Sequence, residues 1–388
     1  MKVLITGGAG FIGSATAEAL SAAGHTVTVL DTFSEQIHGD AEQARATEER
    51  VARSAEVVRG DVRDRSVLDE LVPRSDVVVH LAAETGTGQS MYDITHHTDV
   101  NVGGTAALLE TLTTVPHEVR RVVVASSRSI YGEGSYRCPT DGIVHPPARI
   151  ISPGRFDPVC PVCGGPVVMA LTAESAALSP ASVYAATKLA QENLVLAVAR
   201  ARGLSAFALR YQNVYGPGQS LNNPYTGILA VFAREMLAGR PIEIFEDGLE
   251  SRDFVHVADV AAVNVAAVTS PRDEVASVNI GTGRAVSVNE VARLLAHELD
   301  FSGDIRVSGR SRSGDIRHNA ADIELARRTF GFEPRVAVEE GLAEFCRWAR
   351  RVLEEQGTED ATGYVTSLQE LESRGLMSTT GAGESPRA

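Results

Sequence analysis

A tyrosine and a lysine stand four residues apart near the middle of the chain, in the run Val183-Tyr184-Ala185-Ala186-Thr187-Lys188. The run predicts the start of a helix that continues to about Arg202, so the two side chains lie on one helical face. A nearby ammonium group favours a phenolate and lowers the pKa of the phenol. Tyr184 could therefore act as a general base on an alcohol. The alternative is a surface pair without chemistry, and the rest of the chain must decide between them.

A glycine-rich turn follows the first predicted strand, residues 2–6, and precedes a predicted helix from Ser14 to Ala23. It reads Gly7-Gly8-Ala9-Gly10-Phe11-Ile12-Gly13. A strand, such a turn and a helix N-terminus together form a cradle for an anion. The first glycine permits the tight turn, Gly10 lets the backbone approach a pyrophosphate, and Gly13 lets the helix pack closely on the strand. The spacing is GxxGxxG, which by itself would also suit a simple chain reversal.

An acidic residue ends the second predicted strand. This strand, His25 to Leu30, leads into Asp31, roughly 20 residues beyond the glycines. A carboxylate at that distance can accept hydrogen bonds from an adenosine ribose. It would repel a 2′-phosphate, and no Lys or Arg follows immediately, so the sequence favours NAD over NADP. The alternative is an Asp that only caps a turn.

Four further β-branched runs alternate with helical patterns such as Asn101 to Thr113. They cover residues 56–62, 76–83, 121–127 and 204–209. This alternation predicts an α/β protein with a Rossmann-type, doubly wound parallel sheet. Ligands of such sheets bind at the carboxyl ends of the strands. The residues expected at that edge are Asp31, Asp61, Ala83 and Ser127.

Composition narrows the class of protein. The chain has 388 residues, 44% hydrophobic and 22% charged, which is typical of a globular protein with a large core. A formal net charge of −14 argues against nucleic acid or an anionic membrane as the main partner. No apolar run is long enough to span a bilayer, and the N-terminus enters a strand directly, which indicates a cytoplasmic protein. The four cysteines are too few for a disulfide framework and favour thiols or a metal.

Taken in order, the motifs resemble those of the extended short-chain dehydrogenases/reductases, of the NAD-dependent epimerase/dehydratase type that acts on nucleotide sugars. The resemblance runs from residue 1 to about residue 350. Beyond the glycine turn and Asp31, the residues that carry it are Gly60-Asp61-Val62, His80-Leu81-Ala82-Ala83, Asn101-Val102-Gly103-Gly104-Thr105, Ser126-Ser127, Tyr131-Gly132, Tyr184 to Lys188, Arg210 to Pro217, Arg252 to Val260, Asn279 to Thr282 and Arg312 to Asp315.

The resemblance implies roles for individual residues. Ser127 would hydrogen-bond the reacting sugar hydroxyl, Tyr184 would be the acid/base, and Lys188 would lower the tyrosine pKa and hold the nicotinamide ribose. Asp61 and Val62 would contact adenine. The expected NAD-binding residues are Gly7, Gly10, Phe11, Ile12, Gly13, Asp31, Asp61, Val62, Leu81, Ala82, Ala83, Asn101, Tyr184 and Lys188.

The expected partner is a nucleotide-diphosphate sugar. Arg252 and Arg312 are the candidates for the diphosphate, because guanidinium forks pair with phosphate oxygens at two points. Arg128 is open to three interpretations: it could hold the cysteine-containing segment, contact a sugar, or lie in solvent. The full set of expected substrate contacts is Arg128, Asn213, Gln219, Tyr225, Arg252 and Arg312.

The residues that follow Ser127 separate the possible reactions. Related 4,6-dehydratases carry Asp-Glu directly after the catalytic Thr, and related decarboxylases place a Glu nearby, whereas this chain reads Ser127-Arg128-Ser129-Ile130-Tyr131. The absence of an acid here favours a 4-epimerase, which oxidises and re-reduces C4, over a lyase. The alternatives are a nucleotide-4-keto-sugar reductase, a dehydratase or decarboxylase, and an NAD-binding sensor.

Ser127 and Tyr184 are 57 residues apart, longer than is common in the family, and the excess covers about 132–178. It contains Cys138 and Cys160-Pro161-Val162-Cys163-Gly164-Gly165, a pattern that resembles a zinc knuckle. A structural zinc would take Cys138, Cys160 and Cys163, with Asp141 or His145 as fourth ligand. The alternatives are a Cys160–Cys163 or Cys138–Cys163 disulfide, or free thiols. Together with Asn223-Pro224-Tyr225-Thr226-Gly227, this segment resembles the narrower group of dTDP-L-rhamnose 4-epimerase-like enzymes.

The domain organisation is predicted as follows. Residues 1–212 form the NAD-binding domain, which includes the cysteine-containing insert 132–178 and to which 253–282 return. Residues 213–252 and 283–356 form a smaller α/β lobe that binds the nucleotide sugar, and 357–388 form a tail with a short helix near 364–376. The helices 101–113 and 183–202 resemble a pair that forms a four-helix dimer interface in relatives, so a homodimer is expected.

Overall fold

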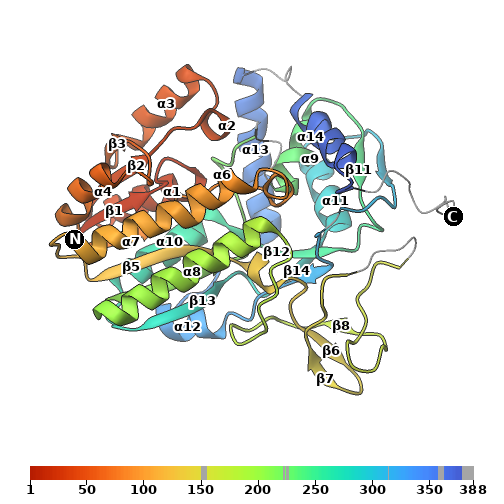
Figure 1. Ribbon diagram of the computed structural model, residues 1–388. Helices are drawn as coiled ribbons and strands as arrows, with labels where there is room; N and C mark the ends of the chain where they lie inside the picture. The colour runs from red at the N-terminus through yellow and green to blue at the C-terminus, as the bar shows by residue number, and fades with distance from the viewer. Residues whose placement is uncertain (150–154, 222, 224–226, 313, 357–361, 378–388) are drawn as a thin grey trace.

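The fold is that of a computed structural model, shown in Figure 1. It describes residues 1–388 apart from 150–154, 222, 224–226, 313, 357–361 and 378–388, and for 362–365 it describes the backbone alone.

Seven parallel strands form the central sheet, in the order β13-β9-β5-β4-β1-β2-β3. The chain moves outward from β1 to β3, then returns to the middle and continues through β4 to β13. The reversal between β1 and β4 is the switch point at which ligands bind in such sheets. This confirms the predicted α/β doubly wound fold. The strands are β1 (Lys2–Thr6), β2 (Thr26–Asp31), β3 (Glu56–Arg59), β4 (Val77–His80), β5 (Arg121–Ser127), β9 (Ser205–Tyr211) and β13 (Val275–Ile280).

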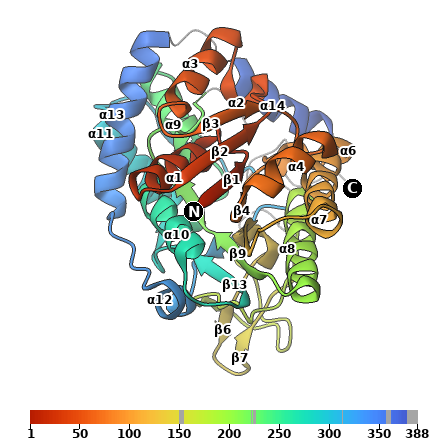
Figure 2. The same ribbon diagram turned by 90° about the vertical axis from the view of Figure 1, so that its left-hand side faces the viewer.

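The strands carry apolar residues on both faces of the sheet, and helices therefore cover both faces. Val3 and Ile5 face one layer of helices and Leu4 faces the other. Figure 2 shows the two layers on opposite sides of the strands. The first layer contains α1 (Phe11–Ala22), α3 (Ala41–Val51), α10 (Val257–Thr269) and α12 (Glu324–Phe330), and the second contains α4 (Arg65–Leu71), α7 (Gly104–Thr114) and α8 (Val183–Arg202).

The helix that carries Tyr184 and Lys188 is α8, and its ends agree with the prediction. Ser182 caps its N-terminus, since its side-chain oxygen accepts the N–H of Ala185 at 3.1 Å. A capped first turn holds Tyr184 at the edge of the sheet where β5 ends at Ser127.

A second, smaller lobe has its own hydrophobic core and two small sheets, as predicted. The predicted return to the first domain at 253 falls within β12, which pairs with strands of the second lobe while its Val255 packs in the core of the first domain, and the domain bounds stay a prediction. The strands of the lobe are β10 (Asn213–Tyr215), β12 (Ser251–His256), β14 (Ala285–Ser287) and β16 (His318–Asn319), with β11 (Ile242–Ile244) paired to β15 (Ile305–Val307); its helices are α9 (Ile228–Leu237), α11 (Val288–Glu298) and α13 (Val338–Gln356).

The cysteine-containing segment folds into a small three-stranded antiparallel sheet, which we call the cysteine sheet. It consists of β6 (Tyr136–Cys138), β7 (Gly142–Val144) and β8 (Val168–Met169), in the order β7-β6-β8. Figure 1 shows it projecting from the main body. Its buried core is only Tyr136, Cys138, Val144 and Cys160, which is small for a sheet that must hold its own shape.

The last described helix, α14 (Thr362–Ser373), lies beside the segment that follows β4, since Tyr92 Oη donates to Glu370 Oε2 at 2.8 Å. Within the described part of the chain, no helix combines the length and apolar character that crossing a membrane requires. The remaining short elements are α2 (Glu35–His38), η1 (Val72–Arg74), α5 (Thr87–Ser90), α6 (Ile94–Thr98), the π-helical turn η2 (Asp99–Gly103) and η3 (Arg128–Tyr131).

Candidate functional site

The glycine turn forms a tight cradle between β1 and α1. Gly7 has a φ of +69°, and a Cβ there would lie 2.7 Å from the main-chain nitrogen of Ala82. A Cβ on Gly13 would lie 2.3 Å from the carbonyl oxygen of Gly7. Both positions therefore exclude a side chain. Gly10 caps α1 without a side-chain acceptor, so the first N–H groups of the helix are available to an anion.

Asp31 lies beside this turn at the end of β2. Its carboxylate accepts the N–H groups of Ala9 at 3.0 Å and Phe33 at 2.9 Å, and it is 9% exposed. A carboxylate has more acceptor positions than these two N–H groups use. The residue is thus held rigidly next to the cradle with capacity left for a ribose hydroxyl.

The other expected cofactor contacts lie along the same edge of the sheet. Leu81, Ala82 and Ala83 follow β4, and Ala82 packs against Gly7. Asp61 follows β3 and is bound by the guanidinium of Arg63 at 2.6–3.1 Å. Val62, Phe11 and Ile12 also lie next to these strand ends, Val62 buried and the other two at the start of α1. Their contacts with a cofactor stay predictions.

Asn101 braces the site from the π-helical turn, a feature that often marks functional positions. Its side chain exchanges two hydrogen bonds with the backbone of Glu84, at 2.7 and 3.1 Å, and donates to Thr187 Oγ1 at 2.9 Å. It is fully buried. Asn101 therefore ties the loop after β4 to α8, and any contact with the cofactor stays a prediction.

Tyr184 and Ser127 meet where α8 begins and β5 ends. The pKa of Tyr184 is raised overall, because burial outweighs the interaction with Ser127 and the charge of Arg128, which both lower it. Ser127 Oγ also accepts the N–H of Ser129 at 3.2 Å and its hydroxyl at 2.9 Å. A half-buried phenol, a hydroxyl and a cation converge here. Such a group can take a proton from a sugar hydroxyl and return it.

Lys188 differs from its expected role as the cation that lowers the pKa of Tyr184. Its ammonium donates to Gln191 Oε1 at 2.8 Å, and burial lowers its own pKa to about 7. The positive charge that lowers the tyrosine pKa belongs to Arg128 instead.

Gln191 continues a buried chain of hydrogen bonds that the sequence did not reveal. Its amide nitrogen donates to Thr105 Oγ1 at 2.8 Å and lies 3.3 Å from His80 Nε2, and His80 Nδ1 lies 2.7 Å from Thr6 Oγ1. Thr6 and His80 end β1 and β4. The chain therefore fixes the catalytic helix to the strands that carry the glycine turn. The three-residue spacing of Lys188 and Gln191 was the one available signal.

A second buried network lies behind Ser127. Glu192 accepts two-point bonds from Arg210 at 2.6–3.2 Å and the hydroxyl of Ser126 at 2.5 Å. Tyr131 accepts from Arg210 at 2.7 Å and donates to Asn279. These residues hold the end of β5 in place, and the charges of Glu192 and Arg210 are paired with each other.

Four of the predicted substrate residues line one cleft of about 260 Å³ between the sheet and the second lobe, whereas Gln219 does not line it. Arg128, Asn213, Arg252 and Arg312 all line it. Burial lowers the pKa of Arg128, and this guanidinium makes no hydrogen bond or ion pair with another described residue. Of the three earlier interpretations of Arg128, its position in the cleft supports contact with a ligand.

Arg252 and Arg312 flank a carboxylate. Arg312 contacts Asp315 at 3.0–3.1 Å, and Arg252 lies 3.6 Å from it while donating to the carbonyl oxygens of Ser251, Ile316 and Arg317. Burial alone would raise the pKa of Asp315, but the two guanidinium charges outweigh it and hold that pKa below its usual range. The pair of cations is pre-arranged around an anion.

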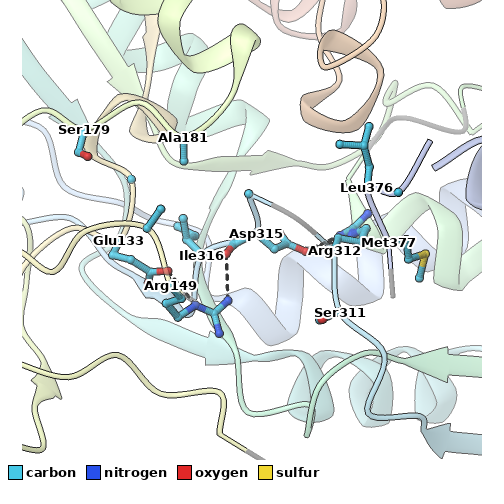
Figure 3. A pocket seen from close by; sticks show the side chains of 14 residues that line it. Glu133, Arg149, Ser179, Ala181, Ser311, Arg312, Asp315, Ile316, Leu376 and Met377 are labelled. Carbon is cyan, nitrogen blue, oxygen red and sulfur yellow. Dashed lines mark hydrogen bonds and ion pairs between the residues drawn. The ribbon is translucent and has the colours of Figure 1, made fainter. Parts of the chain in front are cut away.

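A second hollow of about 340 Å³ adjoins this cleft and shares Arg312 and Asp315 with it. Figure 3 shows Arg149 reaching Asp315 from the side of the cysteine sheet. Arg149 donates to the carbonyl oxygen of Asp315 at 2.9 Å and forms ion pairs with Glu133 and Glu246 at 2.8 and 2.9 Å. The cysteine sheet is thereby connected to the wall of the cleft.

Two of the expected substrate residues carry unsatisfied amide oxygens. Within the described residues, Asn213 Oδ1 and Gln219 Oε1 are buried without a hydrogen-bond partner. A buried acceptor without a donor costs about 1–3 kcal/mol, so these groups indicate a missing ligand. Tyr225 lies outside the described residues.

The model of the NAD dependent epimerase/dehydratase family matches residues 3–149 and 162–281. The chain belongs to this family. The resemblance drawn from the motifs is thus confirmed, and NAD is the cofactor that the family name states. The cradle around Gly7 and Gly13 and the carboxylate of Asp31 fit such a dinucleotide.

Individual relatives resemble the chain along almost its whole length. A dTDP-L-rhamnose 4-epimerase from Burkholderia thailandensis is 37% identical over 358 residues, which is 91% of this chain and 96% of the relative. A UDP-glucose 4-epimerase from Mycolicibacterium smegmatis is 32% identical over 90% of this chain and 99% of the relative. Both are named as enzymes that act at C4 of a nucleotide sugar.

Solved epimerase structures share the fold. The UDP-glucose 4-epimerase from Thermotoga maritima with UDP-glucose is 29% identical, with a TM-score of 0.74 over 91% of this chain and all of that chain. The UDP-glucose 4-epimerase from Thermus thermophilus in complex with NAD is 29% identical, with a TM-score of 0.70 over 90% of this chain and 99% of that chain.

The cysteine sheet of this epimerase/dehydratase family member brings four possible metal ligands together. The ligand atoms of Cys138, Asp141, Cys160 and Cys163 all lie within 4.8 Å of one another. Asp141 Oδ2 lies 3.3 Å from Cys138 Sγ and 3.1 Å from Cys160 Sγ. The other predicted fourth ligand, His145, lies outside this group, with Nδ1 3.5 Å from Ser135 Oγ.

The four cysteines are unpaired in the structure. Cys138 Sγ and Cys163 Sγ are 3.5 Å apart, far longer than the roughly 2.05 Å of a disulfide and close to the roughly 3.8 Å edge of a tetrahedron built on Zn–S bonds. The turn after Cys160 closes with hydrogen bonds from Cys160 N to Gly165 O and from Gly164 N to Cys160 O. The thiols and the carboxylate suit zinc.

Proposed function

We propose that this chain is an NAD-dependent nucleotide-sugar 4-epimerase whose substrate is a dTDP-6-deoxyhexose such as dTDP-L-rhamnose. The observation that carries the proposal is the placing of Tyr184, at the start of α8, beside Ser127, at the end of β5, at the carboxyl edge of the sheet that also carries the glycine cradle. The 37% identity with a dTDP-L-rhamnose 4-epimerase supports the choice of sugar.

The residues of the chain divide the work of the reaction. Tyr184 accepts the proton of the sugar C4 hydroxyl and returns it after the sugar has turned over. Ser127 hydrogen-bonds the same hydroxyl, and the cation of Arg128 stabilises the phenolate. The chemistry supplied by bound NAD is the reversible two-electron oxidation of C4. Each residue ends in the state in which it began, so no reductant is consumed.

The rest of the cleft would hold the substrate. Arg252 and Arg312 provide two guanidinium forks for the diphosphate, and they already surround the carboxylate of Asp315. Asn213 and Gln219 offer amide groups that lack partners among the described residues. We further propose that α7 and α8 form the interface of a homodimer; this assembly and the cytoplasmic location expected from the sequence stay predictions.

The reaction class can be tested with a substrate that carries deuterium at C4. We expect purified protein to convert dTDP-L-rhamnose to its C4 epimer without added NADH, and the product to keep the deuterium at C4. Mass spectrometry and proton NMR of the product measure both. UDP-glucose, UDP-glucuronic acid and GDP-mannose, tested in parallel, would identify the preferred base and sugar.

Other outcomes would contradict this assignment. A net reductase would consume one NADH or NADPH for each product molecule. A lyase would accumulate a keto sugar that has lost water or carbon dioxide. A protein that binds NAD and converts none of these sugars would favour the sensor alternative.

We also infer that Cys138, Asp141, Cys160 and Cys163 bind a structural zinc ion. The cysteine sheet buries few apolar side chains, so a metal would supply much of the free energy that orders it. Two of the thiols are buried and the other two ligands are exposed at the surface, as expected for a site that closes a small fold.

Elemental analysis should find one zinc per chain. We expect Cys160→Ser to lose the metal and to unfold in the cysteine sheet at lower temperature, because a tetrahedral site rarely survives the loss of a buried thiolate. Asp141→His should keep the metal, and Cys346→Ala, which removes a core thiol elsewhere, is the control. Metal-free protein after incubation with zinc, or an intact Cys138–Cys163 disulfide by mass spectrometry, would refute the site.

A further inference from the structure

The segment after α13 closes one end of the substrate cleft. The side chains of Ser367, Leu368 and Leu371 on α14, with Leu376 beyond it, line the same cleft as Arg128, Arg252 and Arg312. Leu376 and Met377 also line the neighbouring hollow, where Figure 3 shows them beside Arg312. The sequence predicted a helix near 364–376 but gave it no purpose. We call residues 362–377 the C-terminal cap.

The cap is attached to the NAD-binding half of the molecule through the loop after α5. Tyr92 Oη donates to Glu370 Oε2 at 2.8 Å, and the guanidinium carbon of Arg374 lies 4.2 Å above the ring of Tyr92. A Cβ built on Gly88, in α5, would lie 3.4 Å from Leu371 Cδ2. Leu371 is only 5% exposed. The apolar side of α14 is thus packed against this wall of the cleft.

The cap is attached equally to the opposite wall. Arg310 forms an ion pair with Glu372 and donates to Met377 Sδ at 3.4 Å. Met377 forms an antiparallel bridge with Arg312, one of the two candidate phosphate-binding arginines. The guanidinium of Arg312 also lies over the ring of Phe245, with its Cζ 5.3 Å from the ring centroid. The cap therefore bridges both sides of the opening.

The side chains of the C-terminal cap suggest which part of a ligand it covers. On its inner side the cap presents Leu368, Leu371 and Leu376, and the cleft beneath adds Met91 and Phe245. Apolar and aromatic surfaces of this kind suit a flat base or the methyl group of a deoxysugar, while the arginines below suit a diphosphate. The anchors to Tyr92 and Arg310 are polar and partly exposed, and such contacts hold a segment weakly.

We propose that the C-terminal cap is a part of the nucleotide-sugar binding site that opens to admit the substrate and closes on its nucleoside diphosphate. This inference rests on the proposed function, because it takes the cleft to be the nucleotide-sugar site. Leu371 is the central contact: it is buried against α5, and it faces the cleft between the two walls. Closure orders Leu368, Leu371 and Leu376 over the ligand and keeps water from the diphosphate.

A matched pair of substitutions tests this inference with dTDP and UDP as probes. Leu371→Asp and Gln369→Asp each add one carboxylate to the same helix, but Leu371 is buried toward the cleft and Gln369 is exposed. We expect Leu371→Asp to raise the calorimetric Kd for dTDP at least tenfold and to leave bound NAD unchanged. Gln369→Asp should bind dTDP as the unaltered chain does.

Hydrogen exchange on the unaltered chain provides a second measurement that needs no variant. We expect dTDP to slow the exchange of amides in 366–377, and NAD alone to leave it unchanged. Unchanged exchange together with an unchanged Kd in Leu371→Asp would overturn the cap, even if the protein epimerises sugars. Tighter binding in Leu371→Asp would also overturn it, because the segment would then obstruct the cleft. If the unaltered chain binds neither dTDP nor UDP and converts no sugar, the proposed function and the cap both fall.

Discussion

Replacing Tyr184 with phenylalanine should lower kcat by about 10³-fold, a typical contribution of a positioned acid/base group. The phenol is the half-buried group beside Ser127, and the charge of Arg128 opposes the rise in its pKa that burial causes. Phenylalanine keeps the ring and loses the oxygen. NAD should stay bound, because the glycine cradle and Asp31 are untouched. Epimerisation of the best substrate, followed by NMR, and the absorbance of bound cofactor measure the two effects.

Tyr211→Phe is the matched control for this substitution. Tyr211 is buried, and its hydroxyl donates to Asn264 Oδ1 at 2.6 Å within the core. Removing that hydroxyl leaves an unsatisfied acceptor, which should cost about 1–3 kcal/mol of stability and leave kcat unchanged. Equal losses of activity in Tyr184→Phe and Tyr211→Phe would contradict the catalytic role of Tyr184.

Gly13→Ala should produce a protein that no longer retains NAD. The added Cβ would lie 2.3 Å from the carbonyl oxygen of Gly7 and 2.6 Å from the Cα of Gly8, so the turn must move away from the helix. Overpacking of this kind costs about 1–3 kcal/mol, which corresponds to a Kd for NAD raised by up to about 100-fold. The cofactor content of purified protein and calorimetric titration with NAD measure the effect.

Gly103→Ala, in the π-helical turn, is the control for Gly13→Ala. There a Cβ would meet nothing within 4 Å, and the position is exposed. Alanine is the better helix former, so this variant should be as stable as the unaltered chain or slightly more stable. If Gly13→Ala keeps its NAD, the glycine turn is not the dinucleotide cradle.

Regular features of the fold were predictable because they depend on local patterns. The strands of the central sheet follow from β-branched runs and glycine turns, and the start of α8 follows from the run Val183 to Lys188. At the site, Tyr184 and Ser127 were predictable because each ends or begins a regular element.

Features that depend on long-range packing were not predictable. The four-residue spacing of Tyr184 and Lys188 suggested that the two side chains interact. In the structure the ammonium of Lys188 instead donates to Gln191, which contacts His80, and Arg128 is the cation that affects the pKa of Tyr184. The choice of Asp141 over His145 depends on how two turns face each other. The docking of α14 on the cleft connects residues nearly 280 positions apart, such as Tyr92 and Glu370, and leaves no local signature.

The contacts of Arg149 have a consequence for how the enzyme would fail. Arg149 lies in the segment that follows β7 of the cysteine sheet, and it donates a hydrogen bond to the backbone of Asp315, the residue around which Arg252 and Arg312 are arranged. Damage to the cysteine sheet, by oxidation or by a chelator, would reach the sugar site through contacts such as those of Arg149 and would spare the dinucleotide-binding half. An enzyme damaged in this way would retain NAD and bind its substrate more weakly.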